Sequence, residues 1–422
     1  MARLVYSIVF YLAQPLVWLR LLWRLRKQPE YLQHVGERYG FHAASAPQPL
    51  LWLHVVSVGE TRAAEPLIKA LLSAYPDHTL LLTHMTPTGR ATGGELIAKY
   101  GERLIQAYLP YDLPDACGRF LDHFKPRFGL LMETELWPNL IAACAQRSIP
   151  LALVNARLSA KSEAGYRRFA PLIRPALAKL SAVAAQTPAD GERLQAIGAQ
   201  RVTVLGNIKF DVTPSPEKIE LGKTWRQALG QREIWLAAST REGEEAIILD
   251  AFARLNRPDL LLLLVPRHPQ RFNEVAALVE QRQLALCRRS GGELPTATTR
   301  VWLGDSMGEM PAYFAVADLA LIGGTLLPFG GQNLIEAAAC GCPVLVGPHT
   351  YNFAQATEDA IACGAALRIA DADAAASTAV KLLEDTATLQ AMRNAAAIFS
   401  QAHRGATART LALIEEISAQ NR

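Results

Sequence analysis

The sequence predicts an α/β protein made of two Rossmann-like, doubly wound halves, and three observations carry this prediction. At 422 residues and 46.0 kDa the chain is too long for one hydrophobic core, so two domains are expected. Apolar runs of strand length alternate with helical patterns along most of the chain, which is typical of parallel βαβ units. A segment of linker composition, Asp211–Pro216, falls at mid-chain.

The first half begins after a polar, proline-containing segment near residues 43–49. We expect a strand at 50–56, a helix from Glu60 to about Ser73 and a strand at 79–84. Helical patterns or polar loops separate the further strands that we expect. These strands are at 104–108, 128–132, 151–154, 182–185 and 202–205.

A second series of the same kind starts after a junction near residue 215. Its expected strands are at 234–238, 260–265, 284–287, 301–303, 319–322 and 343–346. The last helix is expected from about Asp385 to Arg422, and its end, 401–422, is expected to return to the first half. The two halves then span residues 29–212 and 213–400.

The N-terminus differs from that of a plain soluble protein. Residues 4–19 are almost wholly apolar, interrupted by Gln14 and Pro15. About sixteen residues at 1.5 Å each give roughly 24 Å, short of the ~30 Å hydrocarbon core of a bilayer. A basic flank follows, made up of Arg20, Arg24, Arg26 and Lys27. We expect residues 1–28 to be a membrane anchor that spans or lies in the interface, with the body on the cytoplasmic side; the alternative is a buried first helix.

Composition argues against several classes of protein. The formal net charge is only +4 and no basic block occurs, which argues against a nucleic-acid partner. The six cysteines form no CxxC pair, so reduced thiols in a cytosolic compartment are expected. The histidines fall on unrelated loops, and we therefore expect no metal site and no cofactor.

The stretch 319–336 carries the most specific pattern. A buried strand ends in Gly323-Gly324, and a second pair, Gly330-Gly331, opens an alanine-rich helix. Glycines allow a phosphate close to the backbone, and the N–H groups of a helix start attract its charge. Glu336, in the first turn, is placed to accept from sugar hydroxyls. This predicts a nucleotide-sugar site; the alternative is an ordinary strand–turn–helix with glycines for tight packing.

Charged side chains follow the expected strands of both halves. Glu60, at a helix start, is placed to act as a general base or as a helix-dipole partner. Glu133 and Glu135 follow the strand 128–132. Glu133 is placed to orient or stabilise charge in the reaction and Glu135 to cap the next helix; the alternative is that both acids cap that helix. Lys209 closes the last strand of the first half and would offset developing negative charge.

In the second half, Arg241 and Arg267 follow two expected strands and suit a phosphate. The segment 304–309 ends another strand. Together these loops favour a site for an anionic ligand. Two such halves that face each other across a cleft resemble the GT-B glycosyltransferase architecture.

Several of these motifs, in one order along the chain, resemble the 3-deoxy-D-manno-octulosonic acid (Kdo) transferases of lipid A assembly. The similarity runs from the N-terminal apolar segment to Gly347–Phe353 and becomes vague over the last fifty or so residues. Leu326–Phe329 is apolar where we expect a second basic or polar residue in many relatives. The motifs are Ser57–Glu60, Met132–Asn139, Asn155–Ser159, Lys209–Asp211, Pro266–Pro269 and Asn333–Glu336.

The resemblance implies inverting transfer of Kdo from CMP-Kdo to the 6′-hydroxyl of lipid IVA, without a metal ion, at the cytoplasmic side of the bacterial inner membrane. It implies that Glu60 is the proton acceptor and that Glu133 and Lys209 support the transition state. The residues that it implies for CMP binding are Pro266, Arg267, Met307, Gly308, Glu309, Asn333, Leu334, Ile335 and Glu336.

Two other functions are left open by the residues themselves. One is a GT-B transferase or epimerase that acts on a UDP-sugar and shares the glycine-rich loop and its glutamate. The other is a non-catalytic, membrane-tethered nucleotide-binding protein. The number of Kdo residues transferred, the acyl-chain preference and the oligomeric state have no sequence signal.

Overall fold

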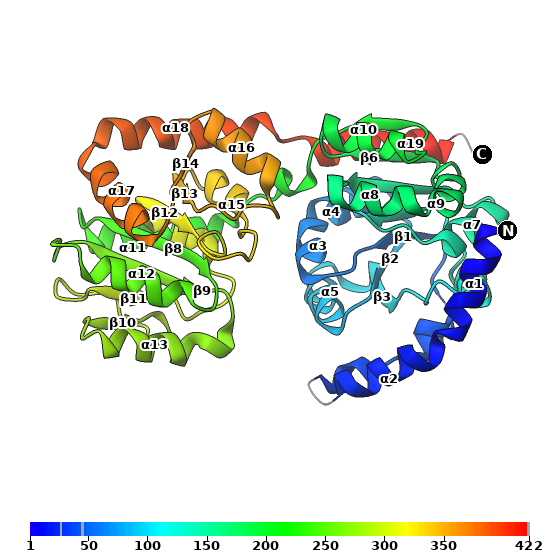
Figure 1. The fold of residues 1–422 in the computed structure, drawn as a ribbon, viewed down its shortest axis with the longest axis horizontal. Coiled ribbons are helices and arrows are strands. Elements are labelled where there is room, and N and C mark those ends of the chain that lie inside the picture. The colour runs from blue at the N-terminus through cyan, green and yellow to red at the C-terminus, as the bar shows by residue number, and fades with distance from the viewer. Residues whose placement is uncertain (26–27, 44–45, 420–422) are drawn as a thin grey trace. The chain divides into compact units, whose positions relative to one another are not determined.

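The computed structural model describes residues 1–25, 28–43 and 46–419 and divides the chain into two compact units (Figure 1). Unit 1 contains Met1–Val212 and Arg404–Arg422, and unit 2 contains Thr213–His403. Arg26 and Lys27, which the sequence analysis places in the basic flank, lie outside the described residues.

Unit 1 is built on a seven-stranded parallel sheet with the order β3-β2-β1-β4-β5-β6-β7. The strand order reverses between β1 and β4, which makes this pair the topological switch point, where ligands bind in open α/β sheets. Every residue of β1 and β4 is buried, as expected for strands covered on both faces. The strands are β1 (Leu50–His54), β2 (Thr79–His84), β3 (Leu104–Tyr108), β4 (Gly129–Met132), β5 (Leu151–Ala156), β6 (Ala182–Ala185) and β7 (Val202–Val204).

Helices connect these strands, and one prediction is wrong in detail. The helix expected from Glu60 to Ser73 is two helices, α3 (Val58–Ala63) and α4 (Glu65–Ala74). Pro66 explains the break, because a proline lacks the N–H that would continue the first helix. The other connecting helices are α5 (Pro87–Tyr100), α6 (Pro114–Phe124), α7 (Pro138–Gln146), α8 (Ala160–Arg168), α9 (Ala170–Leu177), α10 (Pro188–Ala196) and the 3-10 turn η4 (Ile208–Asp211).

Unit 2 repeats the architecture with the strand order β10-β11-β9-β8-β12-β13-β14. Its switch point lies between β8 and β12. Strand β14 was not predicted from the sequence, because only Ala366 of its three residues is buried and no apolar run marks it. The strands are β8 (Ile234–Thr240), β9 (Leu261–Pro266), β10 (Leu286–Arg288), β11 (Val301–Leu303), β12 (Leu319–Ile322), β13 (Val344–Val346) and β14 (Ala366–Arg368).

The helices of unit 2 are α11 (Pro216–Leu229), α12 (Glu244–Ala253), α13 (Phe272–Gln281), α14 (Met310–Val316), α15 (Leu334–Ala339), α16 (Ala354–Ala362), α17 (Ala372–Glu384) and α18 (Thr386–Ala402). Helices α12, α13 and α17 cover one face of the sheet of unit 2 and contribute to one core cluster (Figure 1). On the other face, Trp225 of α11 and Tyr313 of α14 pack against Trp302 of β11.

The chain ends in two helices, not in the single helix expected from Asp385 to Arg422. Helix α18 belongs to unit 2 and α19 (Ala406–Ala419) to unit 1. Gly405 separates them with φ +92°, a left-handed conformation that glycine adopts without strain. Asp211 fixes the start of α19, because its carboxylate accepts from the N–H groups of Gly405 (2.6 Å) and Thr407 (2.5 Å).

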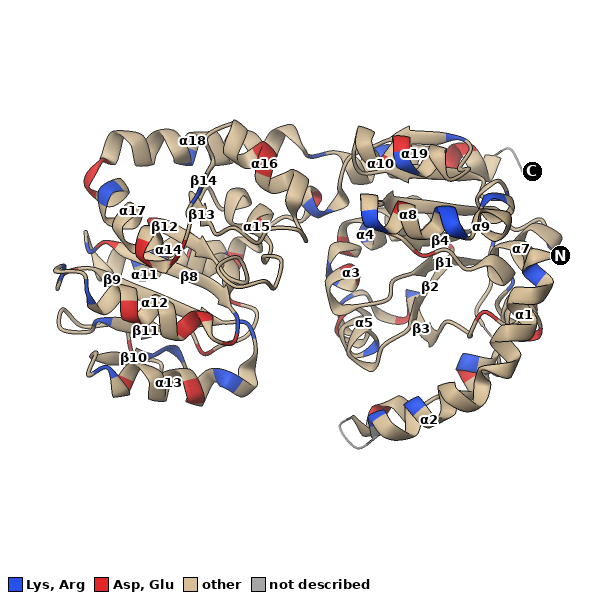
Figure 2. Ribbon diagram, in the orientation of Figure 1, with Lys and Arg blue, Asp and Glu red and all other residues tan. Residues whose placement is uncertain are grey.

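The N-terminal segment forms α1 (Ala2–Leu12) and α2 (Gln14–Leu25), and Figure 2 shows α1 almost without charge because Arg3 is its only charged residue. The alternative of a buried first helix is wrong, since only Ser7 of α1 is buried. Among the described residues no single helix is long and apolar enough to cross a membrane. The two helices pass that test only as a pair bent by 47°, by length and composition alone.

Candidate functional site

The switch point of unit 1 holds Glu60 at the start of α3, directly after β1. Ser57 is the N-cap of this helix and accepts from the Glu60 N–H at 3.4 Å. The Glu60 carboxylate in turn accepts from the Ser57 hydroxyl (2.9 Å) and the Val56 N–H (2.8 Å). This reciprocal arrangement resembles a capping box and holds the carboxylate in one orientation. Burial, with a contribution from the Glu133 charge, raises the pKa of Glu60 and so makes it a stronger base.

Glu133 follows β4, the neighbour of β1, in a strained backbone conformation. Its φ is +63°, uncommon for a residue with a side chain, and such residues cluster at functional sites. Its carboxylate accepts from Lys209 Nζ at 2.9 Å and lies 3.7 Å from Arg157 Nε. The structure therefore brings Glu133 and Lys209 together as an ion pair.

Two asparagines place Lys209 at this edge of the sheet. Asn155, at the end of β5, has φ +50° and accepts from the Ile208 N–H at 3.0 Å. Asn207 accepts from the Lys209 N–H at 3.0 Å. This role of Asn155 was not predicted from the sequence, because the N–H group that it accepts from lies 53 residues further along the chain.

Glu135 belongs to the same acidic group, although sequence reasoning offered it only as a helix cap. Its carboxylate accepts from Trp137 Nε1 at 2.8 Å. The expectation that Glu133 and Glu135 cap α7 is wrong. Asp112 does so, by accepting from the N–H groups of Asn139 (3.0 Å) and Leu140 (2.8 Å).

The pKa of Glu135 rises to about 7, because burial disfavours its charged form and the Glu60 and Glu133 carboxylates repel it. The Trp137 hydrogen bond acts in the opposite direction. Glu60, Glu133 and Glu135 thus form a coupled set of three acids, in which Glu133 is paired with a lysine.

In unit 2, the predicted donor residues lie at the end of β9 and in the segments that follow β9, β11 and β12, up to the first turn of α15. These strands run parallel in one sheet, so their carboxyl ends meet at a common edge. Arg267, directly after β9, donates its N–H to Thr240 O at 3.0 Å. The Arg241 guanidinium carbon lies 4.7 Å from the centre of the Phe329 ring, a cation–π contact.

The predicted residues after β11 differ in solvent exposure. Met307 is exposed, and Gly308 has φ +76°. Glu309 is buried, with its carboxylate accepting from Arg289 Nε and Nη2 at 3.1 Å each. The carboxylate of Glu309 is thus already paired within unit 2.

Asn333 is the N-cap of α15 and accepts from the Ile335 N–H at 3.1 Å. The side chains of Leu334 and Ile335 are buried, so these two residues present only backbone groups to a ligand. Glu336 lies in the first turn of α15, as expected.

Four N–H groups of the glycine-rich loop are taken by acceptors within unit 2. Gly323 donates to Ala238 O (2.8 Å) and Gly324 to the Glu244 carboxylate (2.6 Å). Gly331 and Gln332 donate to carbonyls of the first glycine pair at 2.8 and 3.0 Å.

Tight packing explains two of these glycines, as the alternative interpretation held. A Cβ on Gly323 would lie 2.4 Å from Ser239 O, and a Cβ on Gly330 would lie 2.4 Å from the Tyr351 ring. Both distances are far shorter than a real contact, so a side chain at either position would displace its neighbours.

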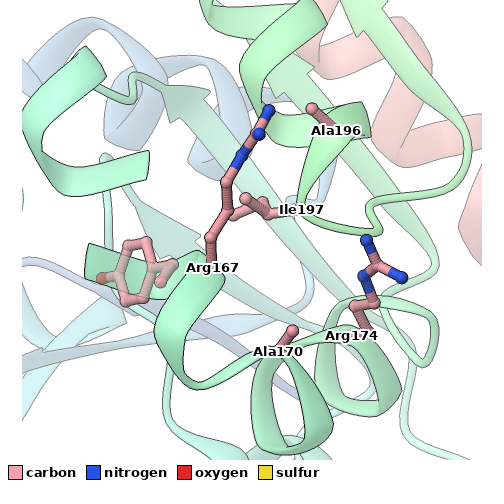
Figure 3. A pocket seen from close by; sticks show the side chains of 6 residues that line it. Arg167, Ala170, Arg174, Ala196 and Ile197 are labelled. Atoms are coloured by element: carbon pink, nitrogen blue, oxygen red, sulfur yellow. The ribbon is translucent and has the colours of Figure 1, made fainter. Parts of the chain in front are cut away.

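A surface pocket in unit 1 contains none of the predicted site residues. Figure 3 shows it between α8, α9 and α10, with the Arg167 and Arg174 side chains at its wall. Within the described part of the chain, no three histidine, cysteine or acidic side chains are grouped as metal ligands. Metal independence stays a prediction.

Comparison with known proteins decides the family. Residues 33–212 match the family described as 3-Deoxy-D-manno-octulosonic-acid transferase (kdotransferase). The chain is 48% identical over 431 residues to the 3-deoxy-D-manno-octulosonic acid transferase of Bordetella pertussis, covering 99% of each protein. The chain belongs to the Kdo transferase family. The Haemophilus influenzae Kdo transferase is 38% identical over the full length of both chains. The family predicted from the sequence is confirmed, and with it the enzyme class, a glycosyltransferase.

Solved structures establish the fold of this Kdo transferase family member. A glycosyltransferase from Rickettsia africae has a TM-score of 0.60 at 13% identity, covering 87% of this chain and 98% of that one. The UDP-N-acetylglucosamine 2-epimerase of Neisseria meningitidis has a TM-score of 0.57 at 16% identity, covering 87% and 99%. These likenesses, with the two parallel seven-stranded sheets, confirm the predicted GT-B fold class.

Proposed function

We propose that this enzyme transfers Kdo from CMP-Kdo to the 6′-hydroxyl of lipid IVA, with inversion at C2, in lipopolysaccharide biosynthesis. The observation that carries the proposal is the group at the switch point of unit 1: a locally held Glu60 beside a Glu133–Lys209 ion pair, in a chain of the Kdo transferase family. In such a transfer an acceptor hydroxyl must lose a proton as it attacks the donor carbon.

Glu60 is the proton acceptor in this proposal. The acceptor O–H bond breaks toward its carboxylate, the new C–O bond forms at C2 of Kdo, and the bond from C2 to the phosphate oxygen breaks, with the electron pair leaving on CMP. The raised pKa of Glu60 supports this role, because a stronger base removes a hydroxyl proton more readily. Lys209, held by Glu133 at 2.9 Å, supplies the positive charge that supports the transition state.

Unit 2 binds the CMP moiety in this proposal, through the residues that follow β9, β11 and β12. The phosphate charge is met by Arg267 and Arg241, since several N–H groups of the glycine-rich loop are taken by acceptors within the protein. Glu309 contributes through the loop that it holds, because its carboxylate is paired with Arg289. The transfer step uses no metal ion and no cofactor.

The enzyme acts at the cytoplasmic face of the bacterial inner membrane, with α1 and α2 in the interface. Ser7 donates to Asn139 Oδ1 at 3.1 Å, so α1 is fastened along unit 1 and does not project from it. This favours an interfacial helix pair over a span. The opposite side of the pair exposes large apolar residues: Leu4, Ile8, Leu12, Leu16, Leu19 and Trp23.

Family membership favours Kdo transfer over UDP-sugar chemistry, although an epimerase shares the fold. A thermal-shift measurement with CMP and with UDP separates the two, since a ligand of the native state raises its melting temperature. We expect the larger shift with CMP. A larger shift with UDP would favour the alternative.

The deciding experiment incubates the protein with lipid IVA, CMP-Kdo and no divalent metal, and detects Kdo addition by mass spectrometry.

Glu60→Gln is expected to lower the transfer rate by about 100-fold or more, because general bases contribute ~10²–10⁴ to rates. Its CMP affinity should stay within about twofold of wild type, since Glu60 lies in unit 1. An active Glu60→Gln variant would show that Glu60 is not the base and would leave it the role of a helix-dipole partner.

A further inference from the structure

Glu244 is a fully buried carboxylate in unit 2 that the proposed mechanism does not use. It is the first residue of α12, and its exposed fraction is 0%. A buried, uncompensated carboxylate is strongly unfavourable, so its hydrogen bonds must repay the loss of water. Burial raises its pKa, whereas backbone N–H donors oppose that rise.

Those donors come from two different loops. From the loop after β8, the Arg241 N–H donates to Oε2 at 2.9 Å. From the glycine-rich loop after β12, Gly324 donates to Oε2 at 2.6 Å, and Leu326 and Leu327 donate to Oε1 at 3.0 and 3.4 Å. One carboxylate therefore holds together the two loops on either side of the switch point of unit 2.

The same two loops carry the groups proposed for donor binding. The Arg241 guanidinium lies over the Phe329 ring, a second contact between them. The glycine-rich loop leads directly into Asn333, the N-cap of α15. A ring of N–H groups of this kind attracts anions, and here the protein's own carboxylate fills it.

We propose that Glu244 is a positioning residue of the donor site, which fixes the glycine-rich loop against the Arg241 loop before a nucleoside monophosphate sugar binds. This inference rests on the proposed function, because it assumes that unit 2 binds CMP-Kdo. Glu244 touches no substrate. It acts by sparing the ligand the free energy needed to order the loops.

The test compares Glu244→Gln with Asp318→Asn. Glutamine has the size of glutamate but lacks its charge, and its NH₂ group cannot accept from an N–H. Asp318 also binds several groups of unit 2, namely Arg226 Nη2 (2.9 Å), the Ile234 N–H (2.9 Å) and Arg393 Nη2 (2.8 Å). It precedes β12 and so lies at the opposite end of the sheet from the donor loops.

We expect Glu244→Gln to raise the Kd for CMP and the KM for CMP-Kdo by about tenfold or more, with kcat within about threefold, as for a lost charge-assisted hydrogen-bond set. Asp318→Asn should lower the melting temperature by at least as much as Glu244→Gln lowers it, while leaving the Kd for CMP unchanged. Isothermal titration calorimetry and thermal unfolding give both numbers. If Glu244→Gln fails to fold, Glu244→Asp, which keeps the charge on a shorter arm, takes its place and should weaken CMP binding less than tenfold but measurably.

Addition of formate to Glu244→Ala provides an independent readout, since a small carboxylate can enter the vacated space. It should restore CMP affinity, whereas chloride at equal ionic strength should not. A folded Glu244→Gln variant with wild-type CMP affinity would overturn the inference. Failure of the wild-type protein to bind CMP would instead overturn the proposed function.

Discussion

At the scale of single residues, two neighbouring acids in the turn after β4 differ in the charge of their partners. Glu133 is paired with Lys209 and Arg157, whereas the Glu135 carboxylate accepts from the neutral Trp137 N–H. The pKa of Glu135 is about 7 in the folded protein against an ordinary value of 4.5. Because the folded-state value is the higher one, an ionised Glu135 destabilises the fold above pH 7. That loss disappears as the pH falls from 7 to 4.5.

Glu135→Gln is therefore expected to stabilise the protein at pH 8 by about 1–3 kcal/mol, since each pKa unit corresponds to about 1.4 kcal/mol. At pH 5 the gain should shrink to well under half of that. Urea unfolding of wild type and variant at the two pH values measures the difference. Trp137→Phe is the matched control, because it removes the hydrogen bond that favours the charged form and should lower stability at pH 8. A Glu135→Gln variant that is less stable than wild type at pH 8 would contradict this account.

The residues that sequence reasoning identified correctly as strand-end groups are those whose signal is local. Glu60 and Glu133 each follow an apolar run, and the structure places them after the carboxyl ends of the adjacent strands β1 and β4. The roles that could not be predicted from the sequence depend on distant partners. Asp112 caps α7 from 27 residues away, and Glu244 takes the Gly324 N–H from 80 residues away. Neither pairing leaves a pattern within a sequence window.

At the scale of elements, the N-terminal pair α1–α2 has an apolar side that unit 1 does not cover. Leu16 and Leu19 are 68% and 62% exposed.

The double substitution Leu16→Glu, Leu19→Glu should lower binding to anionic phospholipid vesicles at least about tenfold, because each buried leucine is worth about 1.5–3 kcal/mol. Vesicle flotation measures binding, and the melting temperature of the double variant should equal that of wild type. Ile398→Glu on α18, at a site 66% exposed, is the control and should leave flotation unchanged. Equal flotation of the double variant would place the membrane contact elsewhere.

Elements were predictable where burial and local signals agree. The inner strands of both sheets, such as β1, β4, β9 and β12, appear as apolar runs because they are covered on both faces. The break between α3 and α4 has a visible cause in Pro66, which the periodic pattern alone concealed. Strand β14 gives no such signal, because Leu367 and Arg368 are exposed and only its pairing with β13 makes it a strand.

At the scale of the whole molecule, the chain leaves unit 1 at Val212 and returns to it at Arg404. Sequence periodicity predicts two βαβ series, because each series carries its own pattern. The end of the last helix, 401–422, was expected to return to the first half, and Arg404–Arg422 belong to unit 1. The break between α18 and α19 was not predicted, since the Asp211 carboxylate that anchors α19 is nearly two hundred residues away from its partners. Unit 1 is therefore completed only by the end of the chain.

Removal of residues 404–422 should for this reason unfold unit 1 selectively. Helix α19 contributes Ala406, Ile414 and Ile417 to the core that contains α4, and loss of a buried isoleucine costs about 2–5 kcal/mol against a total stability of about 5–15 kcal/mol. Calorimetry of the 1–403 protein should show the unit 1 transition lost or strongly lowered, with CMP binding retained by unit 2 and Kdo transfer abolished. Asp211→Ala removes only the cap of α19 and should lower unit 1 stability by about 1–2 kcal/mol. If the truncated protein kept both its unfolding profile and its transferase activity, the C-terminal helix would not be part of the first folding unit.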